Sequence, residues 1–238
     1  MFAVAFGAIL PWMLVGFGQD LYYADGPPVP FFGFPYPTRM AVVRLGTGKV
    51  WVWSPIRLTP EGVAAVEAIG PVAYIVSPNK LHHLFLAQWR EHWPDARVYA
   101  PPGLVRKKKQ LHFDAELGEQ PEPEWARDID QTIFRGSVAM EEVVFFHRAS
   151  GTALVGDLIQ RFPAAMATGW KGLFMRLDGL VGQGGTPREW RLSFLRRKAA
   201  RAARQKVLGW NPQRLLVAHG ECASSGAVEI IGAALKWI

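Results

Sequence analysis

Residues 71–104, PVAYIVSPNKLHHLFLAQWREHWPDARVYAPPGL, contain two short β-rich runs on either side of a longer run with a helical period. The first run is dominated by β-branched and aromatic residues, and the last run ends at a Pro-Pro-Gly turn, as strands do. Between them, Leu81, Phe85 and Trp89 recur at the spacing of one helix face. The stretch predicts a strand, a helix and a strand, the repeating order of an α/β fold.

The segment before this stretch predicts a hairpin and another helix. Residues 40–45 and 49–53 form two β-rich runs around a Gly-Thr-Gly turn, and residues 21–24 form a shorter strand that leads into an Asp-Gly-Pro-Pro turn. Thr59 is a natural N-cap for a helix with proline at its first position, and Gly70 is expected to end that helix.

The C-terminal half returns to strands. Residues 131–137 and 141–158 are β-rich, and residues 214–220, RLLVAHG, form a strand that is followed by an apolar terminal helix. Residues 159–210 are rich in Gly and Arg and read as an insertion. We expect its apolar part to form a hydrophobic lid over a cleft, with a membrane or partner surface as the alternative. Since neither an internal repeat nor a clean linker is visible, we predict one domain over residues 1–238.

Composition and charge narrow the function classes only partly. The chain has 238 residues, half of them apolar, a net charge of +7 and one cysteine, Cys222, which excludes an intramolecular disulfide and a cysteine-based zinc cluster. One cysteine favours a reducing, cytoplasmic location. A basic helix is predicted within residues 189–210, but no nucleic-acid module accompanies it, so we expect no specific nucleic-acid binding.

Residues 1–18 form an apolar N-terminal extension without a charged side chain, and no Lys or Arg occurs before Arg39. The basic region of a signal peptide is therefore missing, although a signal peptide stays an alternative. The other two readings are a buried or partner-covered segment, which we favour, and a membrane-associating one. Together with the Arg-rich helix, the extension leaves contact with a membrane surface as an alternative to a purely cytoplasmic protein.

Polar residues follow three of the predicted strands. Residues 77–83 follow AYIV, Asp157 follows TALVG, and His219 follows RLLVA, so their side chains are expected at one cleft. His and Asp are ligands for zinc or iron, and such a site activates water for hydrolysis. The alternatives are that His219 only makes structural hydrogen bonds, that Asp157 only caps a turn, and that His82 and His83 point to different sides of a helix start.

Three of these stretches, SPNKLHHLFLAQWREHWPDARVYAPPGL, EEVVFFHRASGTALVGDLI and LLVAHG, resemble a bacterial domain family of unknown function within the metallo-β-lactamase superfamily. The resemblance runs from about Leu21 to the C-terminus. It implies a four-layer αββα sandwich, with the insertion around residues 159–210 and a site at the edge where the two sheets meet.

The superfamily's motif Thr-His-x-His-x-Asp-His aligns with residues 77–83 and shows which ligands are missing. Pro78 and Lys80 stand at its first two histidines, and Ser137 stands at the histidine of a later Gly-His motif. All three positions hold ligands of the first metal in the superfamily. The resemblance therefore implies that the first metal site is lost.

The positions of the second metal's ligands carry residues that can bind a metal, although His82 stands where the motif has Asp and is expected either as a fourth ligand or as a residue that orients the ligands. The same alignment implies metal ligands at His82, His83, Asp157 and His219 for one divalent metal, zinc, iron or manganese. We expect Asp157 and Lys80 to act in catalysis, with Lys80 holding an anionic part of an unknown small-molecule substrate. The expected function is a metal-dependent, hydrolase-like one. The alternative is a metal-free, non-catalytic member of the fold that binds a ligand or partner, and the oligomeric state stays open.

Overall fold

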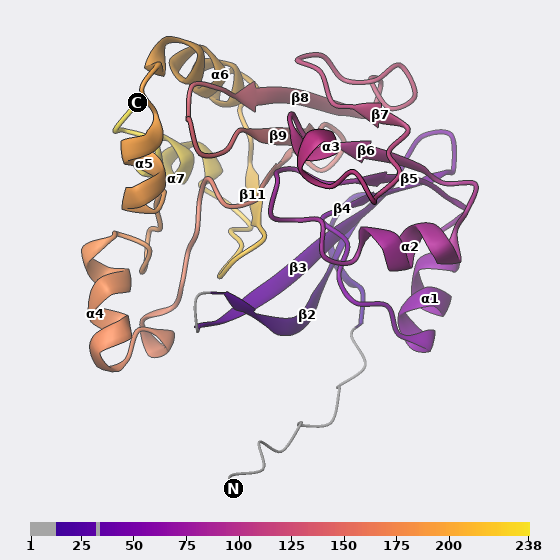
Figure 1. Ribbon diagram of the computed structural model, residues 1–238, viewed down its shortest axis with the longest axis horizontal. Helices are drawn as coiled ribbons and strands as arrows, with labels where there is room; N and C mark the ends of the chain where they lie inside the picture. Colours follow the sequence, from indigo (N-terminus) through magenta and orange to yellow (C-terminus); the bar gives the residue numbers. More distant parts are fainter. Residues whose placement is uncertain (1–12, 32–33) are drawn as a thin grey trace, which may run out of the picture.

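The computed structural model describes residues 13–31 and 34–238 and contains two β-sheets that pack face to face (Figure 1). The first sheet has the order β1-β2-β3-β4-β5-β6-β7, and the second has the order β11-β10-β9-β8. The strands are β1 (Val15–Gly18), β2 (Leu21–Phe31), β3 (Phe34–Arg44), β4 (Val50–Trp53), β5 (Val72–Val76), β6 (Arg97–Ala100), β7 (Ala115–Glu116), β8 (Ile129–Phe134), β9 (Glu142–His147), β10 (Thr152–Val155) and β11 (Arg214–Val217).

Helices cover the outer face of each sheet, so the molecule has four layers. Val66 of α1 and Trp89 of α2 pack on the first sheet, whereas Ala203 of α6 and Ile231 of α7 pack on the second. This arrangement confirms the predicted αββα sandwich. The helices are α1 (Pro60–Glu67), α2 (Leu86–His92), α3 (Leu104–Lys107), the 3-10 helix η1 (Ala164–Met166), α4 (Gly169–Leu177), α5 (Arg188–Ser193), α6 (Arg197–Gly209) and α7 (Ala227–Ala234).

An aromatic core holds the two sheets together. Trp51 of β4 is fully buried between them and makes edge-on ring contacts with Trp125 and with Phe145 of β9, at centroid distances of 6.2 and 5.1 Å. Each edge-on aromatic pair adds about 0.5–1.5 kcal/mol beyond the burial of its area. Because Phe145 belongs to the second sheet, these contacts fix how the two sheets lie against each other.

Several local predictions are confirmed by the described residues. The turn at residues 46–48 joins β3 to β4, which pair antiparallel. Thr59 caps α1, because its hydroxyl oxygen accepts a hydrogen bond from the amide of Gly62 at 3.1 Å. The prediction of a turn at Asp-Gly-Pro-Pro is wrong. Strand β2 continues through these residues, and its pairing with β3 shifts register between Gly26 and Val29. A bulge absorbs the two prolines, which cannot donate to the strand ladder.

Two predicted helices begin or break elsewhere. The helix predicted from Leu81 starts only at Leu86, because the hydroxyl of Ser77 donates to the carbonyl oxygens of Asn79 and His82 and holds residues 77–82 in a turn. The helix predicted over residues 189–210 is divided into α5 and α6 around the buried Phe194. Since α6 packs on the second sheet, the end of the predicted insertion belongs to an outer layer.

The N-terminal extension is described only from residue 13. Within it, β1 forms the edge of the first sheet and pairs antiparallel with β2. The remainder of the apolar extension, residues 1–12, lies outside the described residues. Among the helices of residues 13–31 and 34–238, none combines the length and the hydropathy needed to cross a bilayer.

His147 of β9 makes the stability of the fold depend on pH. Its side chain is buried, and its Nδ1 donates to the Ser150 hydroxyl at 2.8 Å, since that hydroxyl itself donates to Thr152. Burial lowers the pKa of His147, against the charges of Asp128 and Asp20. The unfolded chain therefore takes up this proton first, and stability present above a pH of about 6.5 is lost as the pH falls below it.

We predict that the free energy of unfolding in urea decreases more steeply between pH 7.5 and 5.5 in the wild type than in a His147→Gln variant, which has no titrating ring. The variant is expected to be less stable by about 1–3 kcal/mol at pH 7.5, because its amide fills the ring's space incompletely. Parallel pH profiles of the two proteins would contradict the assignment to His147.

Candidate metal centre

The candidate site lies where strands from both sheets end. Strands β4 and β5 run parallel in the first sheet, and β10 and β11 run parallel in the second. Ser54 follows β4, His82 lies in the turn after β5, Asp157 follows β10, and His219 follows β11. Because parallel strands end on the same side of a sheet, this topology brings four separate segments to one edge.

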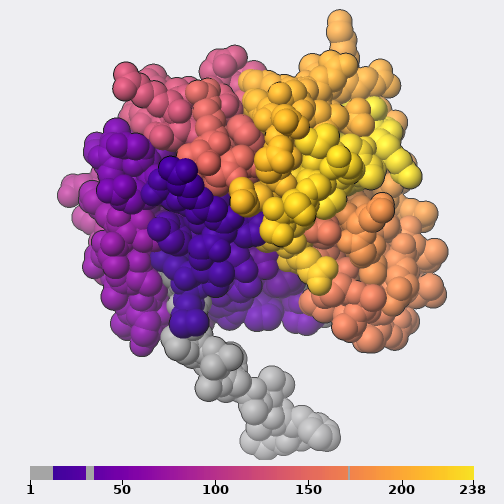
Figure 2. Space-filling model, turned by 180° about the vertical axis from the view of Figure 1, so that it is seen from behind, coloured from indigo at the N-terminus to yellow at the C-terminus, as the bar shows by residue number. Residues whose placement is uncertain are grey.

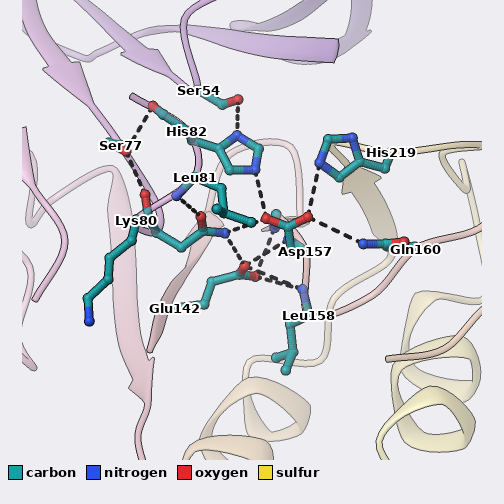
Figure 3. A network of polar contacts seen from close by, with 12 residues as sticks. Ser54, Ser77, Lys80, Leu81, His82, Glu142, Asp157, Leu158, Gln160 and His219 are labelled. Carbon is teal, nitrogen blue, oxygen red and sulfur yellow. Dashed lines mark hydrogen bonds and ion pairs between the residues drawn. The ribbon is translucent and has the colours of Figure 1, made fainter. Parts of the chain in front are cut away.

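Three of the side chains that the sequence singled out converge there. Asp157 lies between the two rings: its Oδ2 is 3.2 Å from Nε2 of His82, and its Oδ1 is 3.2 Å from Nε2 of His219 (Figure 3). The three ligand atoms that could hold a metal ion lie within 4.8 Å of one another. All three side chains are more than nine-tenths buried.

The hydrogen bonds behind His219 fix which of its nitrogens faces Asp157 as an acceptor. Nδ1 of His219 lies 2.7 Å from the carbonyl oxygen of Pro37, which can only accept a hydrogen bond. Nδ1 therefore carries a proton. In the neutral ring, Nε2 then carries no proton, and its lone pair is directed at Oδ1 of Asp157.

His82 is fixed in the same sense by a different partner. The hydroxyl of Ser54 donates to the carbonyl oxygen of Arg39 at 2.9 Å, so it can only accept from Nδ1 of His82, at 2.6 Å. The neutral His82 ring consequently also turns the lone pair of Nε2 toward Asp157. Both histidines are held in the same way: a protonated Nδ1 donates a hydrogen bond to an oxygen whose position is fixed.

Two lone pairs facing one carboxylate repel it unless a positive charge lies among them. Protons on the two rings or a metal cation would supply that charge. Burial opposes ionisation of Asp157, but the rings of His219 and His82, when they carry protons on Nε2 as well, lower the pKa of its carboxyl well below the usual value. Histidine ligands in metal sites characteristically donate their second nitrogen to a carbonyl or other oxygen, as both rings do here.

A second carboxylate lies beneath Asp157. Glu142, at the start of β9, is fully buried, and its oxygens accept hydrogen bonds from the amides of Gly156, Asp157 and Leu158. Asn79 donates to both carboxylates, at 2.7 Å to Glu142 and 2.8 Å to Asp157. Burial and then the charge of Asp157 raise the pKa of Glu142 to about 8. Because Glu142 accepts hydrogen bonds from these three successive amides, it holds the loop that carries Asp157 in its conformation.

Polar side chains on the other side complete the shell. Gln160 donates to Oδ1 of Asp157 at 3.3 Å and accepts from the hydroxyl of Tyr36 at 2.5 Å. The ring of Tyr36 lies edge-on to the ring of His219, at a centroid distance of 4.7 Å. Burial, and next the charge of Asp157, raise the pKa of Tyr36. Tyr36 is therefore a neutral hydrogen-bond donor beside the site.

A pocket of about 230 Å³ opens onto Asp157, His82 and His219. Apolar side chains line much of it. Its one guanidinium, that of Arg39, is bound to Asp25 and to the carbonyl oxygens of Val217 and Gly220. The apolar residues are Val29, Pro30, Pro55, Ile56, Leu81, Leu84 and Phe85.

His83 and Lys80, which the sequence also singled out, lie apart from this group. His83 borders the same pocket, but its Nδ1 donates to the carbonyl oxygen of Lys80 at 3.0 Å. Burial, followed by the charges of Lys108 and Lys107, lowers the pKa of His83. Figure 3 shows the Lys80 side chain directed away from Asp157.

The three positions at which the sequence motif implied missing ligands make other contacts. Lys80 lines a separate, polar pocket together with Arg106. Ser137 shares a hydrogen bond with Ser193 at 2.7 Å and accepts the amide of Met140. Pro78 offers only its carbonyl oxygen, which accepts the amide of Val143. Within the described residues, the potential metal ligands form one group.

Sequence reasoning missed Asn79, Glu142, Ser54, Tyr36 and Gln160. The only signal for Glu142 was an acidic residue at the start of an apolar strand, and Glu141 beside it gave the same signal. Ser54 and Tyr36 lie in the N-terminal hairpin region, far from the ligands in sequence. Their roles arise from contacts between segments about 30 to 180 residues apart.

Comparisons with known proteins agree with this architecture. A family model described as "Domain of unknown function (DUF4336)" matches residues 31–170, and no curated protein matches the chain. Among solved structures, the mono-zinc form of the metallo-β-lactamase FIM-1 from Pseudomonas aeruginosa is 14% identical, with a TM-score of 0.64 over 96% of both chains. A metallo-β-lactamase from Hirschia baltica is 12% identical, with a TM-score of 0.61 over 94% of this chain and 98% of its own. At such identities the likeness concerns the fold.

We predict that Asn79→Ala lowers the free energy of unfolding by about 2–4 kcal/mol, because Glu142 and Asp157 both lose a buried donor. Gln213→Ala, which removes an exposed amide, is a matched control with an expected change within about 0.5 kcal/mol. Urea denaturation at neutral pH measures both. Equal stabilities would show that Asn79 does not hold the two carboxylates.

Proposed function

The chain belongs to the DUF4336 family and has the fold of the metallo-β-lactamases, and from this premise we propose that it is a hydrolase-like protein that binds one divalent metal ion. The proposed ligands are His82, Asp157 and His219. The observation that carries the proposal is that both imidazoles turn Nε2 toward one carboxylate while Nδ1 donates to a fixed oxygen.

The donor set fits a divalent metal. Two imidazole nitrogens and one carboxylate oxygen suit zinc, iron or manganese, and three protein ligands leave a position open to the pocket. When bound, such an ion supplies a Lewis acid that polarises a substrate oxygen and activates water. The fixed oxygens of Ser54 and Pro37 keep both rings in the ligand tautomer before any ion arrives.

The surrounding residues would bind and orient the substrate. The apolar walls of the pocket exclude water, which strengthens electrostatic interactions at the site. The ring of Tyr36 lies beside the ring of His219, and its hydroxyl donates to Gln160, which in turn donates to Asp157. Because Lys80 lines a different pocket and Arg39 is paired, we leave the expected anionic group out of the proposal. A substrate with an apolar portion fits the pocket better.

A non-catalytic binding protein is the second candidate. It is favoured by Pro78, Lys80 and Ser137, none of which adds a nitrogen or carboxylate ligand for a second ion. A two-metal site holds both the attacking and the leaving oxygen, and one ion can stabilise only part of that charge. Turnover of hydrolysable ester, thioester or amide probes by metal-loaded protein separates the two: activity that disappears in Asp157→Asn supports the hydrolase.

We predict about one zinc, iron or manganese ion per chain in protein purified without an affinity-tag metal column, measured by elemental analysis. Asp157→Ala and His219→Ala are expected to lose the ion, because each removes one of three ligands. His83→Ala is the matched control, and it should retain the ion, since the His83 ring is bound to Lys80.

Circular dichroism establishes whether the variants are folded. Folded protein that contains no metal and takes up none from solution contradicts the proposal. Loss of the ion in His83→Ala but not in His82→Ala would instead support the ligand that the sequence motif implied.

A further inference from the structure

We propose that the exposed apolar face of α4 docks this protein on an anionic lipid surface. We define the α4 face as Trp170, Leu173, Phe174 and Leu177, whose exposed fractions are 67%, 57%, 59% and 54%. These positions follow the spacing i, i+3, i+4, i+7, so the four side chains form one stripe along the helix. The stripe points to solvent, whereas an ordinary surface helix turns such a stripe to the core.

The other side of α4 explains this orientation. Gly172 is buried, and a Cβ atom placed on it would lie 2.0 Å from the carbonyl carbon of Ala167. The helix therefore lies directly against Ala167, the residue that follows η1, through a glycine on the side opposite the large apolar side chains. Trp170 and Phe174 contact each other edge-on, at a centroid distance of 6.0 Å, which gives the stripe a defined shape.

The distribution of charge selects an anionic surface as the occupant. Residues 161–206 contain eleven Lys and Arg and only two Asp and Glu, a net charge of +9, whereas the remaining residues carry −2. The excess positive charge of the whole protein thus lies in the segment that contains α4, α5 and α6. Figure 2 shows the orange residues around α4 on the side opposite the violet segment that contains α1, and the gold residues of α6 at the top of the same view.

Neighbouring side chains extend the same combination. Leu192 of α5 and Leu195 after it are 76% and 72% exposed, and the basic residues of α6 follow directly in the chain. Helices that lie in a membrane interface combine an apolar stripe containing Trp, Phe and Leu with Lys and Arg beside it. A protein partner would need acidic groups to match this charge, but phospholipid headgroups supply them over any area.

The docking face lies close to the metal centre. A groove beside α4 is lined by Phe174 and Met166 together with Tyr36 and Gln160. Tyr36 also lines the pocket over Asp157. Docking through α4 would therefore place the pocket beside the lipid, within reach of an apolar substrate. The docking itself does not depend on the proposed function, since it requires no metal.

Flotation of the full-length protein with vesicles tests the proposal. We expect binding to vesicles of phosphatidylcholine mixed with phosphatidylglycerol, weak binding to phosphatidylcholine alone, and a decrease as salt rises from about 0.1 to 0.5 M. Leu173→Ser/Leu177→Ser should reduce partitioning by about tenfold or more. Val15→Ser/Val105→Ser is the matched control; it removes two exposed apolar side chains that lie outside residues 161–206 and outside the pocket over Asp157, and it should bind as the wild type does.

Four outcomes overturn the proposal: absence of flotation, equal flotation of the α4 variant, equal binding to both vesicle types, and binding that is lost only when residues 1–12 are removed. Self-association through α4 is a further contradicting result, visible as a lower molar mass of the variant in light scattering without vesicle binding by the wild type. Because all substituted side chains are exposed, circular dichroism should show unchanged folding.

Discussion

A buried carboxylate that faces two imidazole nitrogens is the contact around which this molecule is organised. The carboxylate of Asp157 contacts Nε2 of His82, which follows a strand of the first sheet, and Nε2 of His219, which follows a strand of the second sheet. Each ring is held from behind by an oxygen that requires a proton on Nδ1. The arrangement is costly without a cation or added protons, because lone pairs and a negative charge would otherwise oppose each other in a dry environment.

A second buried acid, Glu142, stabilises the loop that holds Asp157 in this position. Glu142 binds three successive amides of the loop that carries Asp157, and Asn79 joins Glu142 to Asp157. The same region ties the sheets together, since the amide of Val143 in β9 donates to the carbonyl of Pro78 after β5. The position of the proposed ligand thus depends on contacts between the sheets, and the site should lose its geometry when the sheets separate.

The sequence patterns predicted an α/β order, most strands and the approach of Asp157 and His219, because strand patterns and the residues that follow strands are local signals. The four layers were implied by the family resemblance and not by these patterns. The sequence predicted less about the histidine pair. Alignment with the family motif implied both His82 and His83, but the turn that Ser77 imposes directs only the ring of His82 to Asp157. The roles of Ser54, Tyr36 and Glu142 depend on long-range contacts, and the outward face of α4 depends on the close approach of Gly172 to Ala167.

Nitrogen NMR of the six histidine side chains observes directly which ring nitrogens carry a proton and which bind a metal ion. On addition of zinc, we predict that His82 and His219 alone shift their Nε2 resonances to metal-bound values while both keep a proton on Nδ1, with assignments made by single His→Gln variants. Unchanged resonances, or a shift at His83 in place of His82, would contradict the account.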